Sequence, residues 1–275
     1  MKGHIRKKIL FLSLFFFTRV VVSLEYQPWF SELYNLHLLS SYSYSYYSSV
    51  DGASIPLSST SKDHFILFDV EYTPSTNWNI NADINFLDTP RQKRMNFMSS
   101  AFHLRYLWLD DIIGDPVSFV MGAHIRYVSK DAIRDISCPY HGRVEGEGDI
   151  SIGKEIDSSI WRFRLWGWGG VGIANKGSPW LHARVVLEAC YNIIHKFAFF
   201  FDTLHSYGRK KTVNIEKFYG YGSIRQKSLD LTARYGYKLG RIGTFRVEYS
   251  YKISAKRCPK NVKTFTLAYL LPINF

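Results

Sequence analysis

The sequence predicts an all-β protein, a single antiparallel up-and-down β-barrel that crosses a membrane with about twelve strands. Apolar and polar residues alternate with a period of two along most of the chain, which is the pattern of strands with two different faces. The apolar face is strongly aromatic, with Phe, Trp and Tyr making up 17% of the chain. Mean hydropathy is only −0.14, which suits a membrane β-barrel because only every second strand residue meets lipid. Soluble all-β proteins alternate too, so further observations are needed.

The N-terminal half of the chain contains six predicted strands. The first places tyrosines and leucines opposite serines, and a loop rich in Ser follows it. A tight turn at 74–76 separates the second strand from the third, whose polar face is almost entirely Asn and Asp. A turn at 110–116 joins the fourth and fifth strands, and a polar loop at 130–141 precedes the sixth. The predicted strands are 32–47, 66–72, 78–86, 102–108, 117–127 and 143–152.

The C-terminal half contains six more, separated by predicted turns at Asp157-Ser158, 176–178 and Gly240-Arg241-Ile242. The strand that begins at Trp161 includes several glycines, which in a strand mark a bend or a bulky neighbour rather than a phosphate cradle. The last three strands show the most regular alternation of aromatic and polar residues. The predicted strands are 161–173, 181–191, 196–202, 228–239, 244–253 and 264–275.

The stretch 203–227 is the difficult one, because its Tyr-Gly-Tyr-Gly run at 219–222 is compatible with a strand. Bacterial barrels have an even number of strands, with both termini on the periplasmic side. Treating the stretch as one long outer loop gives twelve strands, whereas one extra strand would leave the C-terminus outside. Fourteen strands is the alternative if the stretch is itself a hairpin.

The final strand ends on Phe275, an aromatic last residue that closes an alternating run. This ending resembles the C-terminal strand of Gram-negative outer-membrane β-barrel proteins, and the resemblance covers most of the chain at the level of the class, without a subfamily. It implies location in the cell outer membrane, contact with outer-membrane lipids, and recognition of the C-terminal strand by the barrel-assembly machinery.

Residues 1–23 are predicted to be a secretory signal peptide, and 24–275 the barrel. Lys2, Arg6, Lys7 and Lys8 form a basic start, an apolar stretch follows, and Ser23 ends a plausible cleavage site. Removing this segment with its basic residues lowers the formal net charge from +12 to near +7. Scattered lumen and loop charges are the simplest interpretation of this excess, and no nucleic-acid motif accompanies it.

Aromatic residues cluster near the predicted periplasmic ends of the strands, all on the apolar face. Tyr and Trp favour the headgroup level because they combine an apolar ring with a polar tip. In a soluble sheet protein nothing would gather these aromatic residues at one end of the strands. The predicted membrane-anchoring girdle contains Tyr34, Trp78, Trp108, Trp161, Tyr191 and Phe275.

Opposite charges face each other across predicted hairpins. A turn at Gly240-Arg241-Ile242 places Arg234 opposite Glu248 and Asp230 opposite Lys252, and each such pair stabilises by about 0.2–1 kcal/mol. A two-residue turn at Asp157-Ser158 would place two arginines beside the acidic row of the preceding strand. The polar face is therefore expected to be charge-compensated, as a narrow lumen requires.

The polar face is predicted to line the lumen and to offer a possible solute path. Simple packing of the lumen by a salt-bridge network is an equally good interpretation. The two tryptophans on this face either stack on a sugar-like or aromatic solute or fill the lumen. The predicted lumen-lining residues are Arg105, Arg126, Glu145, Glu147, Asp149, Arg162, Arg164, Trp166, Trp168, Arg184, Arg234, Arg246 and Glu248.

Function is predicted to be that of a narrow channel or surface-exposed membrane protein, with no catalytic residues, no cofactor and no metal. A lipid hydrolase of the phospholipase or lipid A deacylase type is one alternative, although no His-x-Ser occurs for a nucleophile and its base. His37, His103, His124 and His182 are predicted to point inward without the close spacing of a metal motif. An adhesin that uses the 203–227 loop is the other alternative.

Three cysteines are present. Cys138 and Cys258 fall in loops predicted on the same side, so a disulfide between them is possible in an oxidising compartment, and their spacing has no metal-site pattern.

Overall fold

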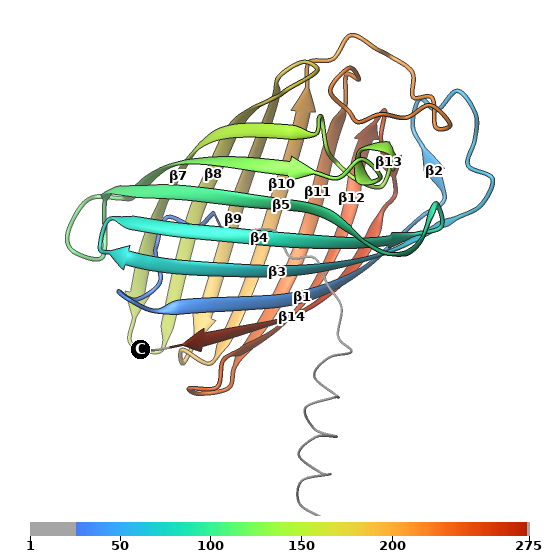
Figure 1. Cartoon of the computed structure of the whole chain (residues 1–275). Helices are drawn as coiled ribbons and strands as arrows, with labels where there is room; N and C mark the ends of the chain where they lie inside the picture. The colour runs from blue at the N-terminus through green and yellow to red at the C-terminus, as the bar shows by residue number, and fades with distance from the viewer. Residues whose placement is uncertain (1–25, 274–275) are drawn as a thin grey trace, which may run out of the picture.

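The computed structural model describes residues 26–273, which form a closed antiparallel barrel of twelve strands (Figure 1). The prediction of an all-β barrel with twelve strands is confirmed. The predicted signal peptide and Phe275 lie outside the described residues. The barrel strands are β1 (Leu36–Tyr47), β3 (Ser61–Ser75), β4 (Trp78–Thr89), β5 (Gln92–Leu109), β6 (Ser118–Val128), β7 (Val144–Ser158), β8 (Trp161–Ala174), β9 (Trp180–Tyr191), β10 (His195–Ser206), β11 (Lys227–Lys238), β12 (Thr244–Lys256) and β14 (Lys263–Ile273).

Each strand pairs with the next along the chain, and β1 pairs with β14 to close the ring. β2 (Ser49–Val50) and β13 (Pro259–Lys260) form a separate small sheet, and η2 (Ala132–Arg134) is a short 3-10 helix. The difficult stretch is one loop, but it is shorter than expected. β10 extends to Ser206, and its residues 203–205 pair with β11, so the loop covers 207–226. The first strand also begins later than predicted, at Leu36.

The two faces of the strands differ as the alternation predicts. On β9, Val185 is 48% exposed and points outward, whereas Val186 is fully buried in the lumen. On β10, Phe199 is exposed and Phe200 is buried. Successive strand residues point to opposite sides, so the barrel has an apolar outer wall and a largely polar inner wall. Among residues 26–273, no helix is both long and apolar enough to cross a membrane.

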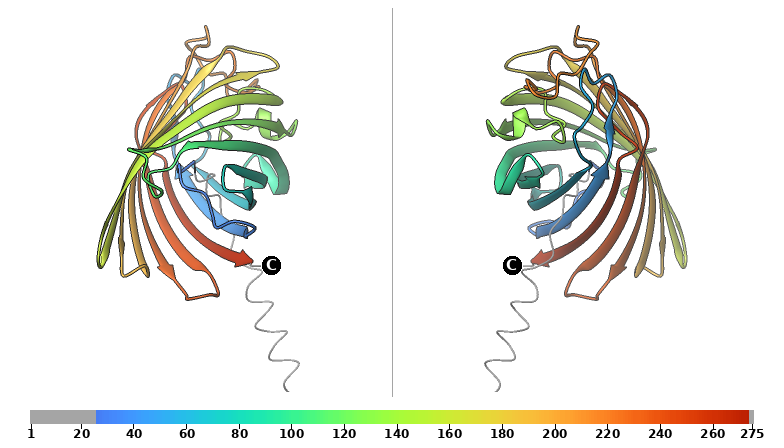
Figure 2. Two further views of the ribbon diagram at one scale, coloured as in Figure 1. Left: turned by 90° about the vertical axis from the view of Figure 1, so that its left-hand side faces the viewer. Right: turned by 90° about the vertical axis from the view of Figure 1, so that its right-hand side faces the viewer.

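The two ends of the barrel differ in the length of their connections. At one end, called here the turn end, the connections are mostly short, including 76–77 and 159–160. At the other, the loop end, the longer loops gather over the strands (upper right in Figure 1; Figure 2 shows them from two further sides). The predicted girdle residues in the described chain all lie at the turn end and are exposed: Tyr34, Trp78, Trp108, Trp161 and Tyr191. Their anchoring in lipid headgroups stays a prediction.

The strand register confirms one predicted set of charge pairs and corrects the other. Arg234 faces Glu248 and Asp230 faces Lys252, with N–O distances of 2.6 Å and 3.1 Å. The β7–β8 turn lies at 159–160 rather than at Asp157-Ser158, because Ser158 pairs with Trp161. The two arginines of β8 therefore face Asp157 and Glu155 instead of the acidic row at 145–149.

Candidate functional site: the barrel lumen

The turn end of the lumen is filled by the segment that precedes β1, residues 26–35, called here the plug. Tyr26 stacks on Trp168 with ring centroids 4.2 Å apart, and its carbonyl accepts a hydrogen bond of 2.7 Å from the Ser151 hydroxyl. The guanidinium of Arg164 lies 4.6 Å from the ring centre of Trp29. The plug is thus held by aromatic and cation–π contacts to the inner wall.

Asp111, in the β5–β6 turn, is the main polar anchor of the plug. Its carboxylate accepts hydrogen bonds from the Trp29 indole at 2.8 Å, from the backbone N–H of Glu155 at 2.7 Å and from the Ser118 hydroxyl. Burial of Asp111 disfavours its charge, but these hydrogen bonds outweigh burial and hold the pKa of the carboxyl below its usual value. The anchor is therefore ionised at neutral pH.

Gly153 makes room for the plug on the inner face of β7. A Cβ atom there would lie 2.7 Å from the Trp29 ring, 2.8 Å from Pro28 and 2.8 Å from Trp166. Such distances are too short for a real side chain, so any other residue would push the plug away from the wall.

The loop end is covered by loops that pack on one another, called here the cap (48–60, 129–143, 207–226 and 257–262). Val213 and Tyr221 of the long loop are buried in one apolar cluster with Tyr47 of β1 and Cys258. The Tyr221 hydroxyl donates to the carbonyl of Ile136 at 2.8 Å. Because buried loop backbone needs partners, these cross-loop contacts show that the long loop folds onto the barrel.

His141 joins its own loop to the long loop and to the connection between β8 and β9. Its ring stacks on Trp180 with centroids 4.0 Å apart, and burial lowers the pKa of His141 to about 3, so the ring is neutral. Its carbonyl accepts the N–H of Gly222, whose own carbonyl accepts the N–H of Ser178. A Cβ at Gly222 would lie 2.4 Å from the His141 carbonyl oxygen, so this close approach requires glycine.

Between the plug and the cap lies a cavity of about 400 Å³, called here the chamber. Its wall carries both signs of charge, with Asp83 and Glu147 facing the same space as Arg126 and Lys252. A second cavity of about 240 Å³ lies along β9–β14 and shares His182 and Thr264 with the first. The lumen therefore holds a partly open space, lined by apolar as well as charged side chains, that is large enough for a small solute.

Every predicted lumen residue lies on the inner face, and most of the charged ones are paired within the wall. Arg126 lies 3.7 Å from Asp83, and Arg184 lies 2.6 Å from Asp202. Local pairing of this kind favours the salt-bridge network over a solute path lined by unpaired charges. The buried members are Arg105, Glu145, Glu147, Asp149, Trp166, Trp168, Arg184, Arg234, Arg246 and Glu248, and the partly exposed members are Arg126, Arg162 and Arg164.

The arginines of β8 lie near the turn end. Arg162 is 2.9 Å from Asp157, and Arg164 is 2.5 Å from Glu155 and 3.7 Å from Glu188. They border the plug rather than the chamber. Any role in a solute path therefore depends on movement of the plug.

The two inward tryptophans fill the lumen together with the plug. Trp166 and Trp168 belong to one buried cluster with Tyr26 and Trp29, and the indole of Trp168 donates to Asp149 at 3.0 Å. The face of Trp168 is occupied by Tyr26 rather than open to a solute.

Cys138 and Cys258 are both buried free thiols, so the disulfide considered from the sequence is not formed. Cys138 packs with Val128 and Ile133, whereas the Cys258 thiol donates to the carbonyl of Lys227 at 3.5 Å. Burial raises the pKa of both thiols, which keeps them protonated.

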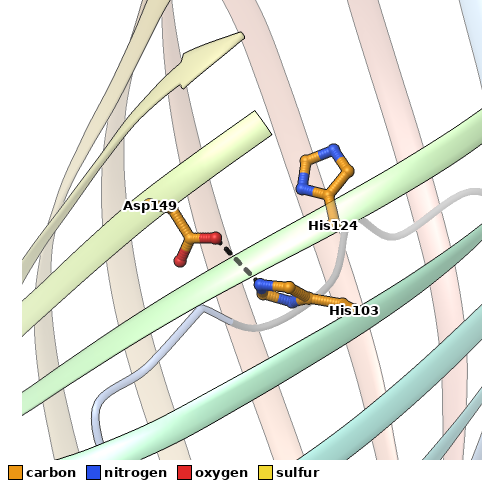
Figure 3. Close-up of side chains that lie close together, drawn as sticks. All are labelled: His103, His124 and Asp149. Atoms are coloured by element: carbon orange, nitrogen blue, oxygen red, sulfur yellow. Dashed lines mark hydrogen bonds and ion pairs between the residues drawn. The ribbon is translucent and has the colours of Figure 1, made fainter. Parts of the chain in front are cut away.

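One grouping escaped the sequence prediction: His103, His124 and Asp149 come together on the inner wall (Figure 3). His103 and His124 are direct cross-strand partners in the β5–β6 hairpin, and Gly122 of β6 faces Asp149. The predicted turn at 110–116 could have revealed the pair of histidines, because pairing the fourth and fifth predicted strands across this turn places His103 and His124 side by side.

The comparisons with known proteins place the fold. No protein-family model and no curated protein matches the sequence. The structure is similar to that of an outer membrane channel from Pseudomonas putida F1, with a TM-score of 0.63 and 9% identity over 92% of this chain and 100% of that one. It is also similar to the NanC porin (TM-score 0.53, 9% identity, 86% and 98% covered) and to the KdgM porin (0.52, 6%, 86% and 99%). The chain therefore has the fold of outer-membrane β-barrel proteins.

Proposed function

We propose that this protein is an outer-membrane channel for small polar solutes, narrow and closed for most of the time by its own plug and cap. The chamber is the observation that carries the proposal, because a cavity with charged and hydroxyl groups in its wall lies inside a barrel whose outer wall is apolar. Its volume of about 400 Å³ falls in the range of about 300–1,000 Å³ that is typical of small-molecule sites. Similarity to a channel and two porins supports the fold on which the proposal depends.

The mixed charge of the chamber favours neutral or zwitterionic polar solutes. Asp83 is matched by Arg126 at 3.7 Å, so neither presents a bare charge. Serine hydroxyls of β1, including Ser43 and Ser45, and the amide of Gln226 add uncharged hydrogen-bonding groups to the wall. A multiply charged solute would have to displace these pairs, at the cost of burying unmatched charges.

Placement in the outer membrane belongs to this proposal. The exposed apolar side chains of the outer wall would contact lipid, and the turn end, with its exposed aromatic residues, would face the periplasm. Export through the predicted signal peptide and insertion by the barrel-assembly machinery through β14 would bring the chain there.

The alternatives are weaker on the described surface. A lipid hydrolase needs a histidine base beside a nucleophile at the lipid-facing wall. Two histidines of that wall hydrogen-bond to tyrosine hydroxyls instead, His64 to Tyr42 at 2.9 Å and His195 to Tyr235 at 2.8 Å. In the proposed adhesive loop most apolar side chains are buried in the cap, whereas Tyr207 and Tyr219 are exposed.

Planar-bilayer recordings of the refolded protein test the proposal. We expect long closed periods broken by small, stepwise openings, because the plug and the cap lie outside the twelve-stranded ladder of the barrel and can move without breaking it. The same preparation should release no fatty acid from phospholipid or lipid A. A permanently silent protein that releases acyl chains would refute the channel and favour the hydrolase.

A further inference from the structure

His103 of β5, His124 of β6 and Asp149 of β7 converge on the inner wall of the barrel (Figure 3). One nitrogen of each histidine and one oxygen of the aspartate lie within 4.8 Å of one another. The residues are 1%, 7% and 5% exposed. Three strands that are consecutive in the barrel thus deliver three groups able to bind a metal ion to one buried point.

We propose that this cluster binds a divalent first-row transition metal ion, with Zn²⁺ as its representative. Two imidazole nitrogens and one carboxylate oxygen suit ions of this class and leave further coordination positions open. With metal–ligand bonds of about 2.0–2.2 Å, tetrahedral ligands lie about 3.3–3.6 Å apart. His103 Nε2 and Asp149 Oδ2, now 2.8 Å apart in a hydrogen bond, would open slightly as a metal replaces the shared proton.

Polar atoms without partners support the site independently. Nδ1 of His124 is buried and has no hydrogen-bond partner, and the same is true of Oε1 of Glu147. Glu147 faces His124 directly across the β6–β7 ladder. Buried polar atoms are nearly always paired, and those that are not call for an explanation such as an ion. His124 therefore has a nitrogen available for coordination, and Glu147 adds a second carboxylate to the wall beside it.

The surroundings hold the aspartate in position. The Trp168 indole donates to Oδ1 of Asp149 at 3.0 Å, leaving Oδ2 directed at His103. Hydrogen bonds of this kind orient a metal ligand and increase its affinity. Gly122 keeps the centre of the cluster open, because a Cβ there would lie 2.7 Å from His103 Nε2 and 2.9 Å from both carboxylate oxygens of Asp149.

Local charge also favours a cation. On the inner wall of β7, Glu145, Glu147 and Asp149 face the lumen in succession. Two guanidinium groups lie nearby and have other partners: Arg126 of β6 is matched by Asp83 at 3.7 Å, and Arg105 of β5 donates to the Gln27 carbonyl and the Ser151 hydroxyl. A divalent ion would offset the acidic row without a new buried cation from the protein.

The chamber gives the site its access. Both His124 and Glu147 line that cavity, so an ion can reach the cluster and retain a water molecule or a solute group as a further ligand. The proposal concerns equilibrium binding to the wall and holds whether or not the protein conducts.

Metal binding is measured on the refolded, detergent-solubilised chain by titration with Zn²⁺ and by visible absorption after loading with Co²⁺. We expect one ion per chain, Co²⁺ bands typical of four or five ligands, and anomalous density at the cluster in crystals. His124→Gln should weaken Zn²⁺ binding by about 100-fold or more, since loss of an outer partner alone costs about 10–100-fold.

His37→Gln is the matched control, because His37 also lies on the inner wall beside a carboxylate, 4.0 Å from Glu71, but away from the chamber. It should leave Zn²⁺ affinity unchanged. Heat-dependent gel mobility confirms that each variant folds. Gly122→Ala provides a second test that retains all three ligands, and it should also weaken binding. Equal affinity in the wild type and His124→Gln, or no saturable binding in the folded wild type, would overturn the proposal.

Discussion

Deletion of residues 26–30 should turn a channel that is mostly closed into one with sustained openings. We expect its time-averaged conductance to rise at least about tenfold, because a barrel of twelve strands is wide enough to hold water once its filling is removed. The deleted part carries the stack of Tyr26 on Trp168 and the contact of Arg164 with Trp29. The plug forms no barrel strand, so the wall should remain intact.

The cap is a second barrier, so the deletion is best recorded in two backgrounds, the wild-type loop and one with 213–221 replaced by a short Gly-Ser linker. We expect the deletion to raise conductance in both, and most in the second. Ile112→Ser is the matched control for the Asp111→Asn variant described below, because Ile112 lies in the same turn and is 60% exposed. It should leave the conductance unchanged. Unchanged conductance in both backgrounds would show that the plug does not close the lumen.

Asp111 sets the pH range over which the plug should stay closed. The pKa of Asp111 is lower in the folded protein than in the unfolded chain. The contribution of its carboxylate to holding the plug is therefore complete above the ordinary carboxyl pKa of about 3.9, and it is lost only as pH falls through the lower pKa of the folded state. Wild-type recordings at pH 5 and pH 7 should therefore show the same degree of closure. Asp111→Asn should open more often at both values, because the amide removes the charge that Trp29 and Lys154 face.

Arg234→Leu should destabilise the barrel by about 3–5 kcal/mol, because it leaves the carboxylate of Glu248 buried without its partner. The two side chains are only 4% and 11% exposed and lie 2.6 Å apart. Glu248→Leu should cost a similar amount, whereas the double variant should recover most of the loss. Urea unfolding in lipid vesicles, followed by tryptophan fluorescence, measures each free energy of unfolding.

The neighbouring pair Asp230–Lys252 is the matched comparison, because it is more exposed, at 25% and 16%, and 3.1 Å apart. Removing one of its members should cost only about 1 kcal/mol or less. If the Arg234 and Glu248 variants simply add, the inner wall is not a coupled salt-bridge network.

The barrel could be predicted from sequence because alternation is a local property. The β11–β12 register was correct because Gly240 and Gly243 both take positive φ and confine the turn to the expected place. The predicted β7–β8 register was wrong because the turn lies at 159–160. Ser159 takes a φ of +23° there, and no glycine in the sequence marks that position as a turn. A shift of turn by two residues preserves the faces but changes every partner.

The interior was harder to predict, because its contacts join distant parts of the chain. The last part of the plug, 32–35, was interpreted as the start of the first strand, since Tyr34 continues its alternation, yet Tyr34 has a φ of +62° and lies outside the extended run. The grouping of His103 with Asp149 depends on two successive strand pairings, β5 with β6 and β6 with β7. The two residues are far apart along the chain, so a search for closely spaced ligand motifs does not find them.

Val185 and Val186 offer the most direct test that the exposed wall faces hydrocarbon and the buried wall faces the lumen. They are adjacent residues of one type on β9, 48% and 0% exposed. Spin labels at each position, in a background with Cys138, Cys190 and Cys258 replaced, are measured in lipid vesicles for collisions with oxygen and with a water-soluble nickel chelate. We expect the label at 185 to collide with oxygen and to exclude nickel, and the label at 186 to be protected from oxygen. Nickel access at 185, or equal oxygen access at both positions, would contradict a membrane-spanning barrel.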